Sequence, residues 1–189
     1  MDAQLSAVIG DLHAAEERLW TLRSTLSRDA WTRRPALARW SPAECLAHLN
    51  LTSEALLPLV REGLHEAGSG LRGSASKYRR DLVGWLVWKA VAPSGGVRTR
   101  TVRAFTPSIE RSPESLIAEF GRLQSEVISC VRAADGLPID HVKLVSPFNA
   151  CLRYNLYAAL TMVPRHQHRH LLQAERAAGV SAPESAIAV

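Results

Sequence analysis

The chain has 189 residues, of which 47% are hydrophobic and 22% are charged, and its formal net charge is +5. These values are typical of an ordinary soluble protein of one globular domain, which buries its own core and needs no disulfide or structural metal to fold. The positive charges are mostly arginines scattered among acidic residues, with one denser run at Arg98–Arg103, so we predict no nucleic-acid partner.

Two long helices are predicted in the first part of the chain. Apolar residues between positions 3 and 26 recur close to the spacing i, i+3, i+4, i+7, which predicts an amphipathic helix over 3–26. The stretch Ser41–Glu44 has a serine cap, a proline at the first helical position and a glutamate at the third, so a second helix is expected over 41–66. Pro58 is expected to bend this helix or to shift its end.

A long connection is predicted between the second and third helices. Residues 67–78 are rich in glycine and serine, and further prolines and glycines follow residue 92. Between these stretches, the apolar residues 81–91 predict a short helix. The longest apolar run, Leu82–Pro93, is interrupted by Lys89 and is too short to span a bilayer, so no membrane association is expected.

The second half of the chain predicts two more long helices. A second serine–proline–glutamate start at Ser112–Glu114 predicts a helix to about residue 134, and a last helix is expected over 152–178, ending at Gly179. We find no convincing set of strands. The expected fold is therefore all-α: a four-helix bundle in one domain, 1–189, with a long insertion, 67–111, between helices two and three.

The stretch PRHQHRH, residues 164–170, carries three of the seven histidines. Because each helical residue is rotated by about 100°, His166 and His170 share one face and His168 points away from it. The pair can bind one metal ion, and Gln173, one turn further along, could orient a ligand or meet a substrate. A solvated polar face is the alternative interpretation of such a pair.

His48 is the candidate third ligand. It lies on the inward stripe of the second helix, where a single histidine is commonly a core residue. In helical bundles, metal sites are assembled from side chains of facing helices, which favours one ligand from helix two and two from helix four. Glu44 lies one turn before His48 and could act as an acid or base behind the ligands, although its capping role is the alternative.

Two separate motifs resemble those of the DinB-like (DinB/YfiT) superfamily. The first is Trp40–Leu49, with Arg34-Pro35 ahead of it, and the second is His166–Gln173, which reads H-x-x-R-H-x-x-Q. The basic loop 97–107 and the stretch Ser146–Asn149 are also similar to this family. The resemblance therefore extends over most of the chain.

This resemblance implies a four-helix bundle that carries a divalent ion, usually zinc or nickel, on three histidines. These map to His48, His166 and His170, and all three positions are filled. Asn149 replaces the glycine that usually follows phenylalanine in the family. Pro164 is expected to break or kink the last helix just before the ligand pair.

The family includes metal-dependent hydrolases and thiol S-transferases, and no residue here chooses between them. We therefore expect an enzyme whose metal activates water or a low-molecular-weight thiol toward a small-molecule substrate. The alternative is a non-catalytic metal- or ligand-binding bundle protein that acts in a stress response. Three widely spaced cysteines without a CxxC pair, and no signal pattern, predict a cytoplasmic protein. Exposed bundle faces would allow a homodimer.

Overall fold

The computed structural model describes residues 1–69, 77–93, 105–107 and 111–180. This part of the chain is mostly helical, with a small two-stranded sheet. The elements in chain order are α1 (Ala3–Thr25), α2 (Arg28–Thr32), α3 (Pro42–Gly68), α4 (Leu82–Ala90), α5 (Pro113–Ala133), β1 (Lys143–Ser146), β2 (Asn149–Asn155) and α6 (Leu156–Ala178). Much of the predicted connection 67–111, including the basic run Arg98–Arg103, lies outside the described residues.

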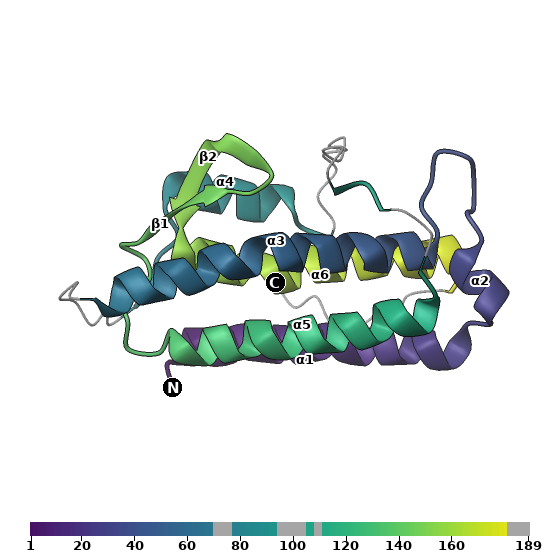
Figure 1. Ribbon diagram of the computed structural model, residues 1–189, viewed down its shortest axis with the longest axis horizontal. Coiled ribbons are helices and arrows are strands. Elements are labelled where there is room, and N and C mark those ends of the chain that lie inside the picture. Colours follow the sequence, from purple (N-terminus) through teal and green to yellow (C-terminus); the bar gives the residue numbers. More distant parts are fainter. Residues whose placement is uncertain (70–76, 94–104, 108–110, 181–189) are drawn as a thin grey trace.

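The four long helices lie side by side, each in contact with two of the others (Figure 1). Helix α3 packs against α5 and α6, and α1 packs against the same two helices. The short helix α4 and the hairpin lie together on one side, where α4 contacts α6 and β2. This arrangement places α3 and α6, which carry the candidate ligands, directly against each other.

The two predicted serine-capped helix starts, at Ser41 and Ser112, are confirmed. The Ser41 hydroxyl accepts a hydrogen bond from the Glu44 amide at 3.2 Å, and the Glu44 carboxylate accepts one from the Ser41 amide at 2.8 Å. This reciprocal capping box satisfies two amide donors that a helix start otherwise leaves unpaired. The Ser112 hydroxyl caps α5 by accepting a hydrogen bond from the Ser115 amide at 3.2 Å.

The prediction of no strands and of a last helix from residue 152 is wrong. Residues 143–146 and 149–155 pair as an antiparallel hairpin, with Leu144 opposite Tyr154 and both side chains buried. Helix α6 begins only at Leu156, because the Asn155 side chain caps it by accepting a hydrogen bond from the Ala158 amide at 2.9 Å. A strand of four residues with two inward positions is too short for alternation to stand out in the sequence.

The prolines inside the long helices do not end them. Helix α3 continues through Pro58 to Gly68, and α6 continues through Pro164 to Ala178. Of the two expected effects of Pro164, the break is therefore wrong, and the kink stays a prediction. Pro164 is buried, and α6 packs against both α1 and α3, so tertiary contacts outweigh the hydrogen bond that a helical proline loses.

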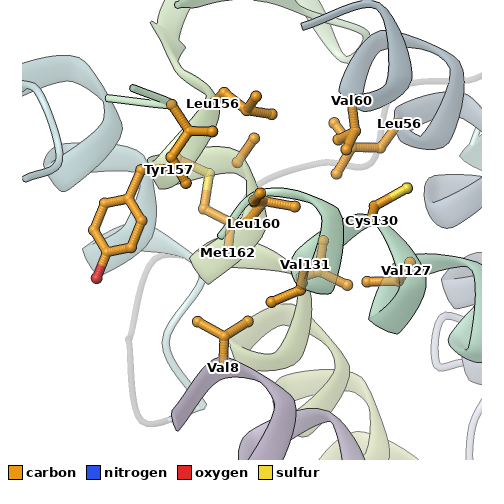
Figure 2. Packing of buried hydrophobic residues seen from close by; sticks show 14 of the residues in the cluster. Val8, Leu56, Val60, Val127, Cys130, Val131, Leu156, Tyr157, Leu160 and Met162 are labelled. Carbon is orange, nitrogen blue, oxygen red and sulfur yellow. The ribbon is translucent and has the colours of Figure 1, made fainter. Parts of the chain in front are cut away.

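Apolar side chains from all four long helices form the core, and Figure 2 shows part of its larger cluster. At the hairpin end this cluster joins the long helices to the sheet. A second cluster fills the other end; its members include Leu19, Trp31, Leu46, Phe120 and Leu171. Gly84 lets α4 approach α6 closely, since a Cβ atom there would lie only 2.4 Å from Cβ of Ala158.

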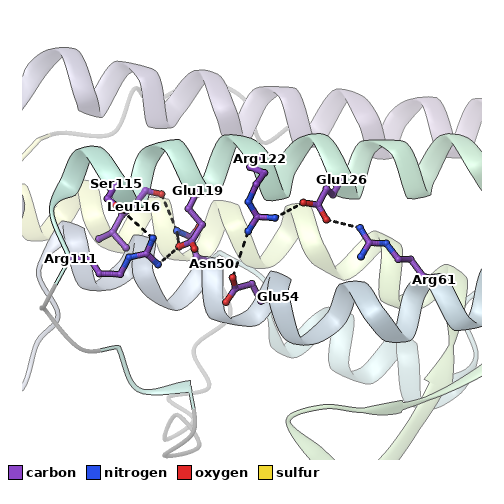
Figure 3. A network of polar contacts seen from close by, with 9 residues as sticks. All are labelled: Asn50, Glu54, Arg61, Arg111, Ser115, Leu116, Glu119, Arg122 and Glu126. Atoms are coloured by element: carbon purple, nitrogen blue, oxygen red, sulfur yellow. Dashed lines mark hydrogen bonds and ion pairs between the residues drawn. The ribbon is translucent and has the colours of Figure 1, made fainter.

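A network of charged side chains crosses the outer surface between α3 and α5 (Figure 3). Arg122 of α5 lies between Glu126 on its own helix and Glu54 of α3, and Arg61 donates to Glu126 at 2.5 Å. Nearer the start of both helices, the Asn50 amide donates to Glu119 at 2.9 Å. These contacts tie the two helices together along the solvent side.

Candidate metal centre

Three histidines from two helices meet at the interface between α3 and α6. The ring centroid of His48 lies 5.2 Å from that of His166 and 4.5 Å from that of His170, and the His166 and His170 centroids are 4.5 Å apart. One ring nitrogen from each histidine lies within 4.8 Å of the other two. In the described residues, this is the one group of three or more His, Cys, Asp or Glu side chains close enough to share an ion.

The three histidines of the 164–170 stretch divide as helical rotation predicts. His166 and His170 face His48, whereas His168 lies against α1. Its Nε2 is 3.1 Å from the Asp11 carbonyl, and its Nδ1 is 3.2 Å from Nη1 of Arg18. His168 is partly buried in this contact.

Hydrogen bonds orient two of the three imidazoles. Nδ1 of His48 lies 2.9 Å from the carbonyl oxygen of Phe105, which can only accept, so Nδ1 carries the proton and donates. Nδ1 of His170 lies 3.1 Å from Oε1 of Gln173 and donates to it in the same way. In both rings the lone pair is therefore on Nε2, the nitrogen that remains for an ion.

Burial keeps the cluster uncharged. It lowers the pKa of His170 to about 3, helped by the charges of His48 and Arg169, and it lowers the pKa of His48 against the effect of the Phe105 carbonyl. Burial also lowers the pKa of His166 well below its ordinary value, with His170 and His48 adding to the effect. All three imidazoles are thus neutral near pH 7, as metal ligation requires.

Three aromatic residues lie at or near the histidines, and one of them, Trp40, places its ring against two of the histidine rings. The Trp40 ring, just before α3, lies 5.0 Å from the His48 ring and 5.9 Å from the His170 ring. The Phe105 ring packs edge-on against Phe148 of the hairpin turn at 4.7 Å, which holds the Phe105 carbonyl beside His48. The role of this carbonyl could not be predicted, because a backbone group has no signature in the sequence.

Glu44 is engaged elsewhere. Its carboxylate accepts a hydrogen bond from Nε of Arg34 at 2.8 Å, in addition to the Ser41 amide. Burial raises the pKa of Glu44, but the hydrogen bonds from Arg34 and Ser41 outweigh it and leave the pKa below its ordinary value. Glu44 is therefore a buried, ionised cap of α3. Burial raises the pKa of the neighbouring Cys45 thiol, which favours an inert core residue over a nucleophile.

The donor set fits a divalent ion. In a tetrahedral site, zinc lies about 2.1 Å from each histidine nitrogen, so these nitrogens are about 3.4 Å apart. In this structure the three ring nitrogens lie within 4.8 Å of one another. Neutral imidazoles with fixed tautomers suit zinc or nickel better than calcium or magnesium, which prefer oxygen ligands. Gln173 and the Phe105 carbonyl are the outer partners that such ligands commonly have.

Comparisons with known proteins agree with the arrangement. A family model described as the DinB superfamily matches residues 11–174, which include all three histidines. No curated protein and no solved structure matches the chain. None of the helices in the described residues has both the length and the apolar character that crossing a membrane requires.

Proposed function

The chain belongs to the DinB superfamily, and from this premise we propose that His48, His166 and His170 hold a divalent ion, zinc or nickel, in a catalytic site. The observation that supports this most strongly is the convergence of three neutral imidazoles from α3 and α6. Two of them present Nε2 because Nδ1 is already engaged. A histidine that serves only to fill the core has no reason to lie with its ring nitrogen within 4.8 Å of those of two other histidines.

We assign the protein to the metal-dependent hydrolases or thiol S-transferases. Three protein ligands would leave a coordination position open, and an ion held by them would supply an activated water or a low-molecular-weight thiol bound as thiolate. The protein's own part is to keep the ligands deprotonated, to orient His48 through Phe105 and His170 through Gln173, and to shield one side with Trp40. The substrate is a small electrophile in either case.

The proposed architecture follows from the same premise. We take α1, α3, α5 and α6 to be the four-helix bundle of the superfamily and residues 67–111 to be an insertion within one domain. The cytoplasmic location and the homodimer stay predictions from the sequence.

Metal analysis of the purified protein tests the proposal. We expect about one zinc or nickel ion per chain, and we expect His48→Ala and His170→Ala to lose it. His65→Ala is the matched control, because His65 is an exposed histidine on the same helix as His48. A wild-type protein that neither contains nor takes up zinc or nickel would contradict the proposal.

Turnover then separates the reaction classes. The loaded protein is assayed against ester, amide and electrophile panels with and without added thiol. Thiol-dependent turnover indicates a transferase, and turnover in water alone indicates a hydrolase. Metal binding that raises the melting temperature without any turnover would instead favour the non-catalytic stress-response alternative.

A further inference from the structure

Two arginines share one tryptophan ring between α4 and α6. Cζ of Arg165, on α6, lies 3.7 Å from the ring centroid of Trp88 on α4. Cζ of Arg80, just before α4, lies 4.2 Å from the same centroid and 5.5 Å from that of Tyr157. The two guanidinium groups are therefore no farther apart than the sum of their distances to the shared centroid.

Neither arginine forms a hydrogen bond or ion pair with a carboxylate in the described part of the chain, although the Asp11 carboxylate acts electrostatically on Arg165. Nε of Arg80 donates to the Thr161 hydroxyl at 2.8 Å, and Nε of Arg165 donates to the Trp88 carbonyl at 2.9 Å. Among the described residues, no hydrogen bond or ion pair engages their terminal Nη groups. Arg18, which is also partly buried, differs in this respect, because it forms a two-point ion pair with Glu175.

Cation–π stacking explains why each guanidinium lies on an aromatic ring, but it supplies no counter-charge. Both side chains are partly buried. Burial lowers the pKa of Arg80. An anion between the two guanidinium groups would be favoured, because both carry positive charge in a partly buried place.

We propose that Arg80 and Arg165, held on Trp88, form a binding site for a small oxyanion, a phosphate or a carboxylate. The planar guanidinium presents its N–H groups as a fork that matches two oxygens, and both forks keep their terminal donors. Arg169 fixes the platform, because its Nη1 donates to the Ala90 and Ala92 carbonyls at the end of α4.

The oxyanion site is separate from the metal centre. Arg165 contacts α4, whereas the next residue, His166, contacts His48 of α3. The site therefore does not depend on a bound ion or on the proposed catalysis. Its occupant is either a free anion or the acidic group of a larger metabolite.

Isothermal titration of the purified full-length chain with inorganic phosphate, and separately with acetate, tests the proposal at constant ionic strength. We expect saturable binding of at least one of the two anions, and Arg80→Gln and Arg165→Gln each to weaken it about tenfold or more. Arg79→Gln is the control: it removes the same charge from an exposed neighbour whose side chain makes no hydrogen bond or ion pair in the described residues. Its Kd should stay within about twofold of wild type.

Binding of phosphate alone indicates a phosphate site, and competition by acetate indicates that carboxylates are also accepted. Circular dichroism and metal content verify that each variant is folded. If a glutamine variant does not fold, the lysine variants decide, since lysine keeps the charge but lacks the fork and should also weaken binding. The proposal is overturned if neither anion binds saturably, if Arg79→Gln weakens binding as much, or if no Arg80 or Arg165 variant changes it.

Discussion

Helix α3 uses polar side chains in opposite ways on its two sides. Toward α5 it presents Glu54 and Arg61, which join Arg122 and Glu126 in an exposed network of full charges (Figure 3). Toward α6 it presents His48, which is only 5% exposed and uncharged. The charged groups of this network pair with one another, so few of them remain to bind a ligand. The three histidines are buried or partly buried and keep a lone pair each, so the side of α3 that faces α6 is the one suited to binding an ion.

The sharpest test of this comparison separates neighbours within one helix. We expect His166→Ala to weaken zinc affinity more than about 100-fold, because the binding free energy of a zinc site, roughly 10–16 kcal/mol, is shared among few ligands. His168→Ala should leave affinity nearly unchanged, since His168 contacts α1 instead. Competition with a chromophoric chelator measures both. Equal loss in the two variants would contradict the assignment of ligands.

Acid should destabilise the metal-free protein through the buried histidines. The pKa of His170 is about 3 when folded, below its ordinary value of 6.5, so the unfolded chain binds more protons between these two pH values. Stability therefore falls as the pH is lowered from about 6.5 to about 3, by roughly 4 kcal/mol for this residue. Urea titrations of apo wild type and His170→Leu from pH 7.5 to 4 check this. Parallel stability curves for the two proteins would refute it.

Gln173 should matter for the ion although it is not a ligand. We expect Gln173→Ala to weaken zinc affinity by about 10–100-fold, because the Nδ1 proton of His170 loses its acceptor and the ring loses its orientation. Gln173→Glu keeps an acceptor and should restore or strengthen binding. The affinities are compared by the same chelator competition. A merely structural role would make both variants equally weak.

The exposed network should matter least. Arg122→Gln removes contacts with Glu54 and Glu126, but solvent and salt screen such pairs. We expect the melting temperature to change by less than about 4 °C and to change even less in high salt. Calorimetry in low and high salt measures this. A larger effect would show that the charged side of α3 contributes more than its exposure indicates.

The parts of the structure that local rules govern could be predicted. Ser41 and Ser112 mark helix starts because a capping residue acts within one turn, and the division of His166 and His170 from His168 follows from helical rotation alone. No local rule connects α3 with α6. His48 could therefore be predicted as the third ligand only from its inward position and from the resemblance to a family.

What could not be predicted depends on contacts between distant segments. In the hairpin, β1 has only four residues and burial does not alternate along β2. Pro164 stays helical because neighbouring helices support it. The Phe105 carbonyl reaches His48 across 57 positions of sequence. Arg18 similarly accounts for the placement of His168.

The separation of the ligands along the chain has a mechanical consequence. An ion bound by both His48 and His166 would close a loop of about 120 residues. Closing this loop would reduce the number of conformations open to the unfolded chain. Such a link between the two halves of the chain would last only as long as the ion is bound. The same contact that prepares the site for chemistry would thereby also govern how readily the protein comes apart.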